Sequence, residues 1–453
     1  MSNEFTGSTS VTGSVPASNE GFLTVTCPAT VTLSYLNALV GGSLPSDLST
    51  VSLSPSFPPS FISSLPPHVI GRFYLIQQYL LGRSSFWHPY IRALPQPEHL
   101  SSWALPAFWP EEDIEFLEGT NAEVAVREVQ ANVKGEFKLA RRILKEVGFP
   151  GWQDYSRLLY NWAFCMFTSR SFRPSTVFSE KLRGGLRERG VLREGVKDDE
   201  FSVLMPVMDI GNHNMRAKVK WDTETEEGVC RFLSRDGMRP GEQVFNNYGM
   251  KTNSELLLGY GFIIPETEGF HNDYVHVRKR NLEGANEAGG GGDEKPKDFL
   301  ISLRPMRDST SVAGASRMRL RAQEDFQVSP ALAHIEDSLV WDLVVSQAEH
   351  DEEVRQAVGK LLQESPPGDV DYVLKQILAW PTTTDVALLV ERVKMALLAK
   401  MGYDYERILD PEVYEDGELA LIPTNSNQEL ACAYRAQCKK VLETAIRSMG
   451  GRI

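Results

Sequence analysis

Hydrophobic and polar positions change their spacing along the chain, and each change marks a predicted element. Residues 22–34, "FLTVTCPATVTLS", are rich in β-branched side chains and predict short strands. Apolar residues then recur at helical spacing over 69–82, over about 111–147 and over 154–172, where Asp154 is the expected N-cap. The first half of the chain therefore predicts short strands followed by a helical block.

The pattern changes again at residue 201. Four short β-compatible runs follow, separated by turn residues: "FSVLMPVMDI", "KVKWDTE", "VCRFLSR" and "EQVFNNYG". Helical spacing returns after about residue 300, and Ser426-x-x-Glu429 is a capping-box sequence ahead of a last amphipathic helix. Strands, an inserted helical region, more strands and a mostly helical C-terminal part together predict an α+β fold rather than a βαβ array.

Two segments differ in composition from the rest of the chain. Residues 1–21 are rich in Ser, Thr and Gly with almost no large apolar side chains, which predicts disorder. Residues 276–299 include an acidic, Gly-rich stretch, which predicts a flexible linker. We therefore expect a disordered N-terminus at 1–21, a first domain at 22–275 with a helical insertion at about 68–195, the linker at 276–299, and a helical domain at 300–453.

Charge and cysteine content narrow the classes of function. The 453 residues carry a net charge of −13, which disfavours a nucleic-acid binder, because such a protein needs a basic face. No apolar run approaches the roughly 20 residues that cross a bilayer, and the N-terminus lacks the apolar core of a signal peptide. The five cysteines are scattered, which fits a reducing compartment and indicates no zinc site. We expect an intracellular protein of the cytoplasm or nucleus, with neither a membrane nor a nucleic acid as partner.

Three polar residues beside apolar runs are candidates for chemistry. Asn212 and His213 follow "MPVMDIG", and Tyr248 lies in "NNYG". Each also has a purely structural interpretation, the pair as a turn that closes a strand and the tyrosine as a core aromatic. Asp209 and His213 are four residues apart, but the residues between them favour a turn, so no metal site is expected. The chain also lacks the GxSxG, P-loop, HExxH and Rossmann patterns.

Read together, these segments resemble the core signature of SET-domain protein methyltransferases. The family's pattern is an Asn-His pair after an apolar strand, then a run of the form Y-G-x-K-S/T-N-x-x-L-L-x-x-Y-G-F, which this chain meets with "YGMKTNSELLLGYGF" at 248–262. The resemblance is to the Rubisco large-subunit methyltransferase-like branch, which includes ribosomal-protein lysine methyltransferases and the actin histidine methyltransferase. "YLLGRSSFWHPYIRALP", "ALPAFWPEEDIEFLEGT" and "FTSRSF" resemble the inserted helical region of that branch.

The resemblance implies roles for individual residues. Tyr248 would place its hydroxyl near the transferred methyl group as the catalytic residue, and would also contact the cofactor. Asn212 and His213 would hold the cofactor, largely through backbone groups at its adenine. Arg170, in "SRSF", would reach the carboxylate end of the cofactor, a task that suits a bidentate guanidinium.

Fold, cofactor and substrate follow from the same resemblance. It implies a SET-type β fold of short strands with an inserted helical region, followed by a helical substrate-binding domain. The cofactor would be S-adenosyl-L-methionine and the acceptor a protein lysine, with Tyr260 and Phe262 as walls of the substrate channel. The acidic balance suits a basic, non-histone target such as a ribosomal protein. We expect the protein to be a monomer.

Two alternatives stay open. The family begins with a strand pair that carries a Gly-x-Gly turn beside the cofactor, whereas Gly7 and Gly13 do not have this spacing. The first alternative is therefore a catalytically inactive, SET-derived protein-binding module that lacks the N-terminal cofactor-binding strands. The second is a histidine methyltransferase, because the same signature serves that activity too.

Overall fold

The chain divides into two compact units, each built from two separate segments. The computed structural model describes residues 23–235, 241–279, 297–320, 326–366, 369–412 and 421–453. The first unit comprises Met1–Leu100 and Val133–Gly249, and the second comprises Ser101–Asn132 and Met250–Ile453. The predicted disordered segment 1–21 and the glycines in it lie outside the described residues.

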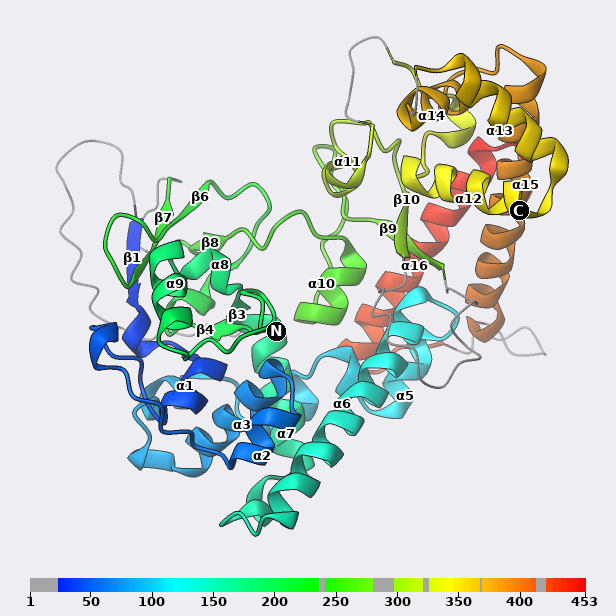
Figure 1. The fold of residues 1–453 in the computed structure, drawn as a ribbon. Coiled ribbons are helices and arrows are strands. Elements are labelled where there is room, and N and C mark those ends of the chain that lie inside the picture. Colours follow the sequence, from blue (N-terminus) through cyan, green and yellow to red (C-terminus); the bar gives the residue numbers. More distant parts are fainter. Residues whose placement is uncertain (1–22, 236–240, 280–296, 321–325, 367–368, 413–420) are drawn as a thin grey trace. The chain divides into compact units, whose positions relative to one another are not determined.

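The first unit carries small sheets of short strands (Figure 1). Its strands are β1 (Leu23–Pro28), β2 (Leu33–Ser34), β3 (Ser171–Phe172), β4 (Val203–Leu204), β5 (Asn212–His213), β6 (Val219–Asp222), β7 (Val229–Ser234) and β8 (Phe245–Asn246). Two antiparallel sheets have the orders β1-β7-β6 and β2-β4-β3, whereas β5 and β8 pair in parallel. The described strands are too short to provide a core alone, so helices must cover them.

Helices make up the rest of the first unit. They are α1 (Tyr35–Val40), α2 (Pro59–Ser64), α3 (Pro67–Leu80), α4 (His88–Ala93), α7 (Arg157–Arg170), α8 (Pro174–Val177), α9 (Glu180–Glu188) and the C-terminal part of α6 (Asn121–Glu146). Helix α3 packs against α1 and α7, and the core at this contact includes the fully buried side chains of Phe73, Tyr74 and Trp162.

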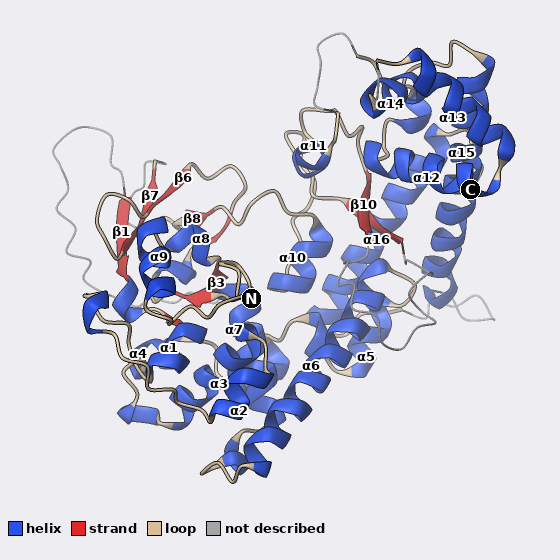
Figure 2. Ribbon diagram, viewed as in Figure 1, coloured by secondary structure: helices blue, strands red, loops and turns tan. Residues whose placement is uncertain are grey.

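The second unit is mostly helical, as Figure 2 shows. Its elements are the N-terminal part of α6, α5 (Glu111–Ile114), α10 (Asn253–Tyr260), the antiparallel strands β9 (Tyr274–Lys279) and β10 (Lys297–Ser302), α11 (Val312–Arg317), α12 (Asp337–His350), α13 (Glu352–Glu364), α14 (Val370–Leu378), α15 (Thr384–Leu409) and α16 (Ser426–Ser448). Short strands and separate helices confirm the predicted α+β class.

Buried polar contacts fix α16 in the second unit. The carboxylate of Asp113 on α5 accepts hydrogen bonds from the side-chain amides of Asn425, Asn427 and Gln428, at 2.8–2.9 Å. One turn and more along α16, the buried Arg435 guanidinium donates to the backbone carbonyls of Glu118 and Ile408. The Asp113 carboxylate and the Arg435 guanidinium thus both have hydrogen-bond partners, without which their burial would destabilise the fold.

Four local predictions were wrong in detail. Ser156, not Asp154, caps α7, since its Oγ accepts a hydrogen bond from the Leu159 N–H at 3.2 Å. The stretch 111–147 breaks at Gly119, whose φ is +80° and where a Cβ would lie 2.0 Å from the carbonyl oxygen of Arg407. Helix α16 begins at Ser426 with Asn425 as its N-cap, so no capping box forms. In the run 201–210 only β4 is extended, and Met208–Ile210 form a 3₁₀-helix, η8.

The predicted domain boundaries stay a prediction. The ends of the proposed 276–299 linker belong to β9 and β10, while residues 280–296 lie outside the described part of the chain. Among the described residues, no helix has the length and apolar character of a membrane span.

Candidate functional site

The Asn-His pair and Tyr248 meet in the first unit at the parallel pair β5–β8. Asn212 lies opposite Phe245 and His213 lies opposite Asn246, so the chain leaves β8 two residues before Tyr248. The backbone N–H of Tyr248 donates to Nδ1 of His213 at 3.0 Å, and the two rings stack with centroids 5.0 Å apart and an interplanar angle of 19°. His213 is buried, whereas the side chain of Asn212 is exposed. The pair therefore divides its tasks: His213 fixes the tyrosine, and Asn212 faces outward.

A second hydrogen bond fixes the other end of Tyr248. Its hydroxyl donates to the backbone carbonyl of Gly211 at 2.8 Å. The next residue, Gly249, has a φ of +98°, a conformation that a residue with a Cβ adopts only under strain. The backbone amide, the ring and the hydroxyl of Tyr248 are thus all held by the segment 211–213.

Arg170 lies at the C-terminal end of α7 and contacts the turn that precedes β5. Its Nη1 donates to the carbonyl oxygen of Asp209 at 3.3 Å and lies 3.6 Å from that residue's Oδ2. The side chain of Arg170 is 29% exposed and that of Asp209 is 2% exposed. The same Oδ2 accepts a hydrogen bond from the hydroxyl of Tyr90 on α4 at 2.9 Å.

The buried carboxylate has an altered acidity. Burial raises the pKa of Asp209, while the Arg170 charge and the hydrogen bond from Tyr90 act in the opposite direction. Burial also raises the pKa of Tyr90 well above its ordinary value, and the Asp209 charge adds to that shift. The hydroxyl of Tyr90 therefore acts as a donor to a carboxylate and not as a base.

The turn before β5 is strained and carries exposed apolar side chains. Val207 has a φ of +73° and a ψ of −35°, and it is the non-glycine residue with positive φ among those described. Val207 is 54% exposed and Ile210 is 70% exposed. Such conformations persist where surrounding contacts over-determine them, often at functional sites. Sequence analysis missed this turn because it reads the same apolar run as a strand.

The predicted channel residues Tyr260 and Phe262 belong to the second unit. Both rings are half-buried, with centroids 6.3 Å apart at 58°. Tyr260 is the last residue of α10 and Phe262 follows its C-cap, Gly261, while a capping box joins Thr252 to Glu255 at the other end of the helix.

Asn253, the first residue of α10, connects this segment to its surroundings. Its side-chain amide donates to the Ile264 carbonyl, to Oδ1 of Asp273 and to Oε1 of Gln437 at 2.7–2.8 Å. The motif's asparagine is thus a structural residue that orders the segment after α10. Burial raises the pKa of its partner Asp273 to about 6.

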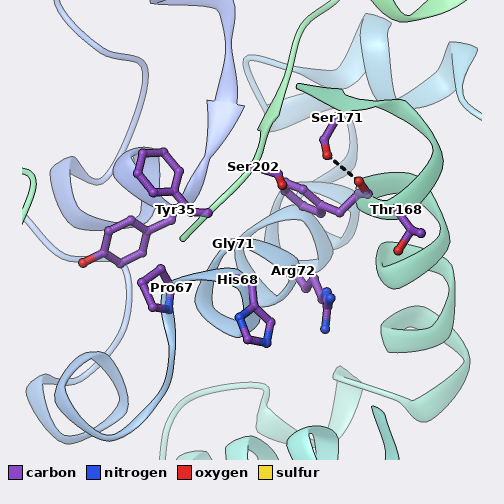
Figure 3. Close-up of a pocket in the computed structure, with 10 residues that line it drawn as sticks. Tyr35, Pro67, His68, Gly71, Arg72, Thr168, Ser171 and Ser202 are labelled. Carbon is purple, nitrogen blue, oxygen red and sulfur yellow. Dashed lines mark hydrogen bonds between the residues drawn. The ribbon is translucent and has the colours of Figure 1, made fainter. Parts of the chain in front are cut away.

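A cavity of about 210 Å³ lies elsewhere in the first unit (Figure 3). Residues of α1, of α3, of the end of α7 and of the segment 201–202 line it. Thr168 and Ser171, which flank Arg170 in sequence, are among the lining residues, but none of the predicted site residues is. This cavity is therefore not the site that the sequence motifs define.

Comparisons with curated proteins find lysine methyltransferases. The chain is 29% identical over 216 residues to the ribosomal lysine N-methyltransferase set10 of Schizosaccharomyces pombe, covering 47% of this chain and 34% of that protein. It is 28% identical over 286 residues to the chloroplastic fructose-bisphosphate aldolase-lysine N-methyltransferase of Arabidopsis thaliana, covering 57% of this chain and 48% of that protein. It is 26% identical over 219 residues to the N-lysine methyltransferase SETD6 of Homo sapiens, covering 45% and 41%. The chain thus spans less than half the length of these relatives.

Solved structures show the same fold. Rubisco LSMT bound to AdoMet superposes with a TM-score of 0.53 at 18% sequence identity, covering 94% of this chain and 80% of that chain. The SET domain of LSMT bound to lysine and AdoHcy superposes equally well, with a TM-score of 0.53. No protein-family model matches the chain. The predicted resemblance and the SET-type fold are confirmed.

Proposed function

We propose that the protein is an S-adenosylmethionine-dependent protein-lysine N-methyltransferase of the SET type. The observation that carries the proposal is the contact between His213 and Tyr248, which joins the two halves of the family signature through a hydrogen bond and a ring stack. The lysine methyltransferases among the relatives support the same activity.

The residues of the first unit fit the cofactor. Arg170 offers a partly exposed guanidinium, which can bind a carboxylate with two parallel hydrogen bonds. Asn212 offers an exposed amide, with one acceptor and two donor hydrogens, beside backbone groups of β5. In the proposal, Arg170 holds the amino-acid end of S-adenosylmethionine, while Asn212 and the backbone of His213 hold the adenine.

When bound, S-adenosylmethionine supplies an electrophilic methyl group on a positively charged sulfur. The acceptor lysine must be neutral to attack, and since its ordinary pKa is about 10.4, an apolar site and a nearby positive charge must favour loss of its proton. The O–H of Tyr248 donates a hydrogen bond to the Gly211 carbonyl, so its oxygen is left to accept hydrogen bonds from other groups. It can therefore orient an amine N–H without giving the amine a proton.

The substrate channel remains a proposal of its own. We assign its walls to Tyr260 and Phe262. The support comes from the two half-buried aromatic rings, which are the kind of surface that desolvates a lysine side chain.

For the target we propose a basic protein surface, with a ribosomal protein as the first candidate. The net charge of −13 favours a basic partner, and one of the relatives is a ribosomal lysine methyltransferase. We further propose that the protein acts as a monomer in the cytoplasm or nucleus. In support of a reducing compartment, no disulfide joins its five cysteines, all of which lie in the described residues.

Calorimetry with S-adenosylmethionine tests the proposal, followed by transfer of a labelled methyl group to purified ribosomal subunits. We expect micromolar binding, loss of that binding in Asn212→Ala, and label on lysine after acid hydrolysis. Fructose-bisphosphate aldolase is tested as a second substrate. The negative net charge of this chain does not favour it.

The same experiments separate the two alternatives. A folded protein that gives no heat with S-adenosylmethionine would be the inactive binding module. Label recovered on methylhistidine would assign the activity to histidine instead of lysine.

A further inference from the structure

The hydroxyl of Tyr90 and the guanidinium of Arg170, the predicted cofactor-binding arginine, both contact the same carboxylate oxygen of Asp209. Tyr90 on α4 donates to Oδ2 of Asp209 at 2.9 Å, and Nη1 of Arg170 lies 3.6 Å from the same atom. All three residues belong to the first unit. Neither the family signature nor the helical periodicity of the sequence singles out Tyr90.

The burial of Asp209 makes this contact consequential. Its side chain is almost fully buried, and a buried carboxylate without partners is strongly destabilising. Arg170 and Tyr90 supply two of its stabilising contacts. The distance of 3.6 Å to Arg170 exceeds that of a close ion pair, whereas the distance to Tyr90 is that of a normal hydrogen bond. The tyrosine is thus the closer of the two partners.

We propose that Tyr90 is a positioning residue for cofactor binding: it holds the Asp209 carboxylate and so keeps the Arg170 guanidinium available to the carboxylate of the cofactor. This inference rests on the proposed function, because it requires a carboxylate-bearing ligand at Arg170. Without the hydroxyl, Asp209 compensates by closing on Arg170, and a ligand carboxylate must then displace it.

The test compares two ligands in the Tyr90→Phe variant. S-Adenosylhomocysteine carries the amino-acid end, whereas 5′-methylthioadenosine has the same adenosine and thioether but no carboxylate. In the full-length protein we expect Tyr90→Phe to weaken S-adenosylhomocysteine binding about tenfold, with 5′-methylthioadenosine binding unchanged. Equal weakening of both ligands would show a merely structural role and overturn the inference.

Tyr79 provides a matched control in the same unit. Its hydroxyl also donates to a carboxylate, Oε1 of Glu98, at 2.7 Å, but that carboxylate does not contact a predicted site residue. Tyr79→Phe removes the same kind of bond, and it should leave the binding of both ligands unchanged. Weaker S-adenosylhomocysteine binding in Tyr79→Phe by the same factor would contradict a specific role of Tyr90.

A double-mutant cycle shows whether Tyr90 acts through Arg170. In the Arg170→Ala background, Tyr90→Phe should cause no further loss of S-adenosylhomocysteine affinity, because its proposed route is gone. Additive losses would overturn the inference. If the wild-type protein binds neither ligand, the proposed function itself is contradicted. If the wild-type protein binds both ligands and Tyr90→Phe binds them equally well, only this inference is contradicted.

Discussion

The backbone N–H of Tyr248 donates to Nδ1 of His213 across a sequence separation of 35 residues, and the two rings stack. This contact gives the side chain of His213 the task of organising the tyrosine. It is compatible with the proposal that His213 holds the adenine of the cofactor through its backbone.

Replacement of His213 should separate catalysis from binding. In His213→Ala, Tyr248 loses both an acceptor for its N–H and a stacked ring, so we expect kcat to fall at least about tenfold while the cofactor Kd changes by less than about threefold. Calorimetry and a methyl-transfer assay measure the two quantities. Equal losses in kcat and in cofactor affinity would show that the side chain of His213 acts on the cofactor.

Tyr248→Phe keeps the ring and removes the hydroxyl. The stack on His213 and the backbone hydrogen bond remain, but the bond to the Gly211 carbonyl and the acceptor oxygen are lost. We expect kcat to fall roughly 10- to 100-fold with cofactor affinity largely preserved, since in the proposed function the lost group orients the methyl acceptor. A variant with unchanged turnover would remove Tyr248 from the mechanism.

Val207→Gly should stabilise the fold. Val207 occupies a positive φ at which a β-branched residue is strained by about 1–3 kcal/mol, and glycine loses somewhat more chain entropy on folding. We expect a net gain of about 1 kcal/mol in the free energy of unfolding, measured by denaturant titration. Ile210→Gly is the matched control: this exposed neighbour lies in η8, where glycine should destabilise.

Asp113→Ala should strongly destabilise the second unit. The change removes the acceptor for three side-chain amides at the start of α16, at least one of which is buried. We expect a loss of about 3 kcal/mol, since buried donors without acceptors bear the full cost of desolvation. Thermal melts should show little change for Glu112→Ala, its exposed neighbour on α5.

Two neighbouring groups should oppose each other in the pH dependence of stability. Burial lowers the pKa of His271 to about 4 and raises that of Asp273 to about 6, and the Asp273 N–H donates to Nδ1 of His271. As pH falls from about 6.5 to 4, the unfolded chain takes up a proton at His271 before the folded one does, which lowers stability. In the same range the folded chain takes up a proton at Asp273 first, which raises stability.

Asp273→Asn isolates the first of these effects. The compensating proton uptake is lost, so the melting temperature of the variant should fall more steeply than that of the wild type between about pH 6.5 and 4. Melts at half-unit steps of pH measure the slope. Parallel curves for the two proteins would show that Asp273 has no raised pKa.

The sequence singled out candidate site residues, but it could not predict how these residues contact one another. The spacing of "YGMKTNSELLLGYGF" and the Asn-His pair were sufficient to predict the resemblance, and the comparisons find the same resemblance and the same fold. The hydrogen bond between His213 and Tyr248 could not be predicted, because it depends on the pairing of β5 with β8. Each of these strands is two residues long, which is too short to show an alternation of apolar and polar residues.

Local signals failed where tertiary contacts decided the outcome. The helix over 111–147 breaks at Gly119, where the backbone of Arg407 lies against the chain. Arg407 is distant from Gly119 in sequence, so no local pattern could predict this contact. Asp154 and Ser156 are both good caps by residue type, and only the structure shows which hydroxyl or carboxylate reaches an amide.

The parallel pair β5–β8 has a kinetic consequence. Its two strands are two residues long, and the antiparallel strands β6 and β7 lie in the connection between them. Such a pair gains little from local contacts, so closing its loop is favourable only after β6 and β7 have joined β1. Tyr248 should therefore reach its place late in folding, when the sheet is already built. Refolding protein should regain native β-structure before it regains the ability to bind its cofactor.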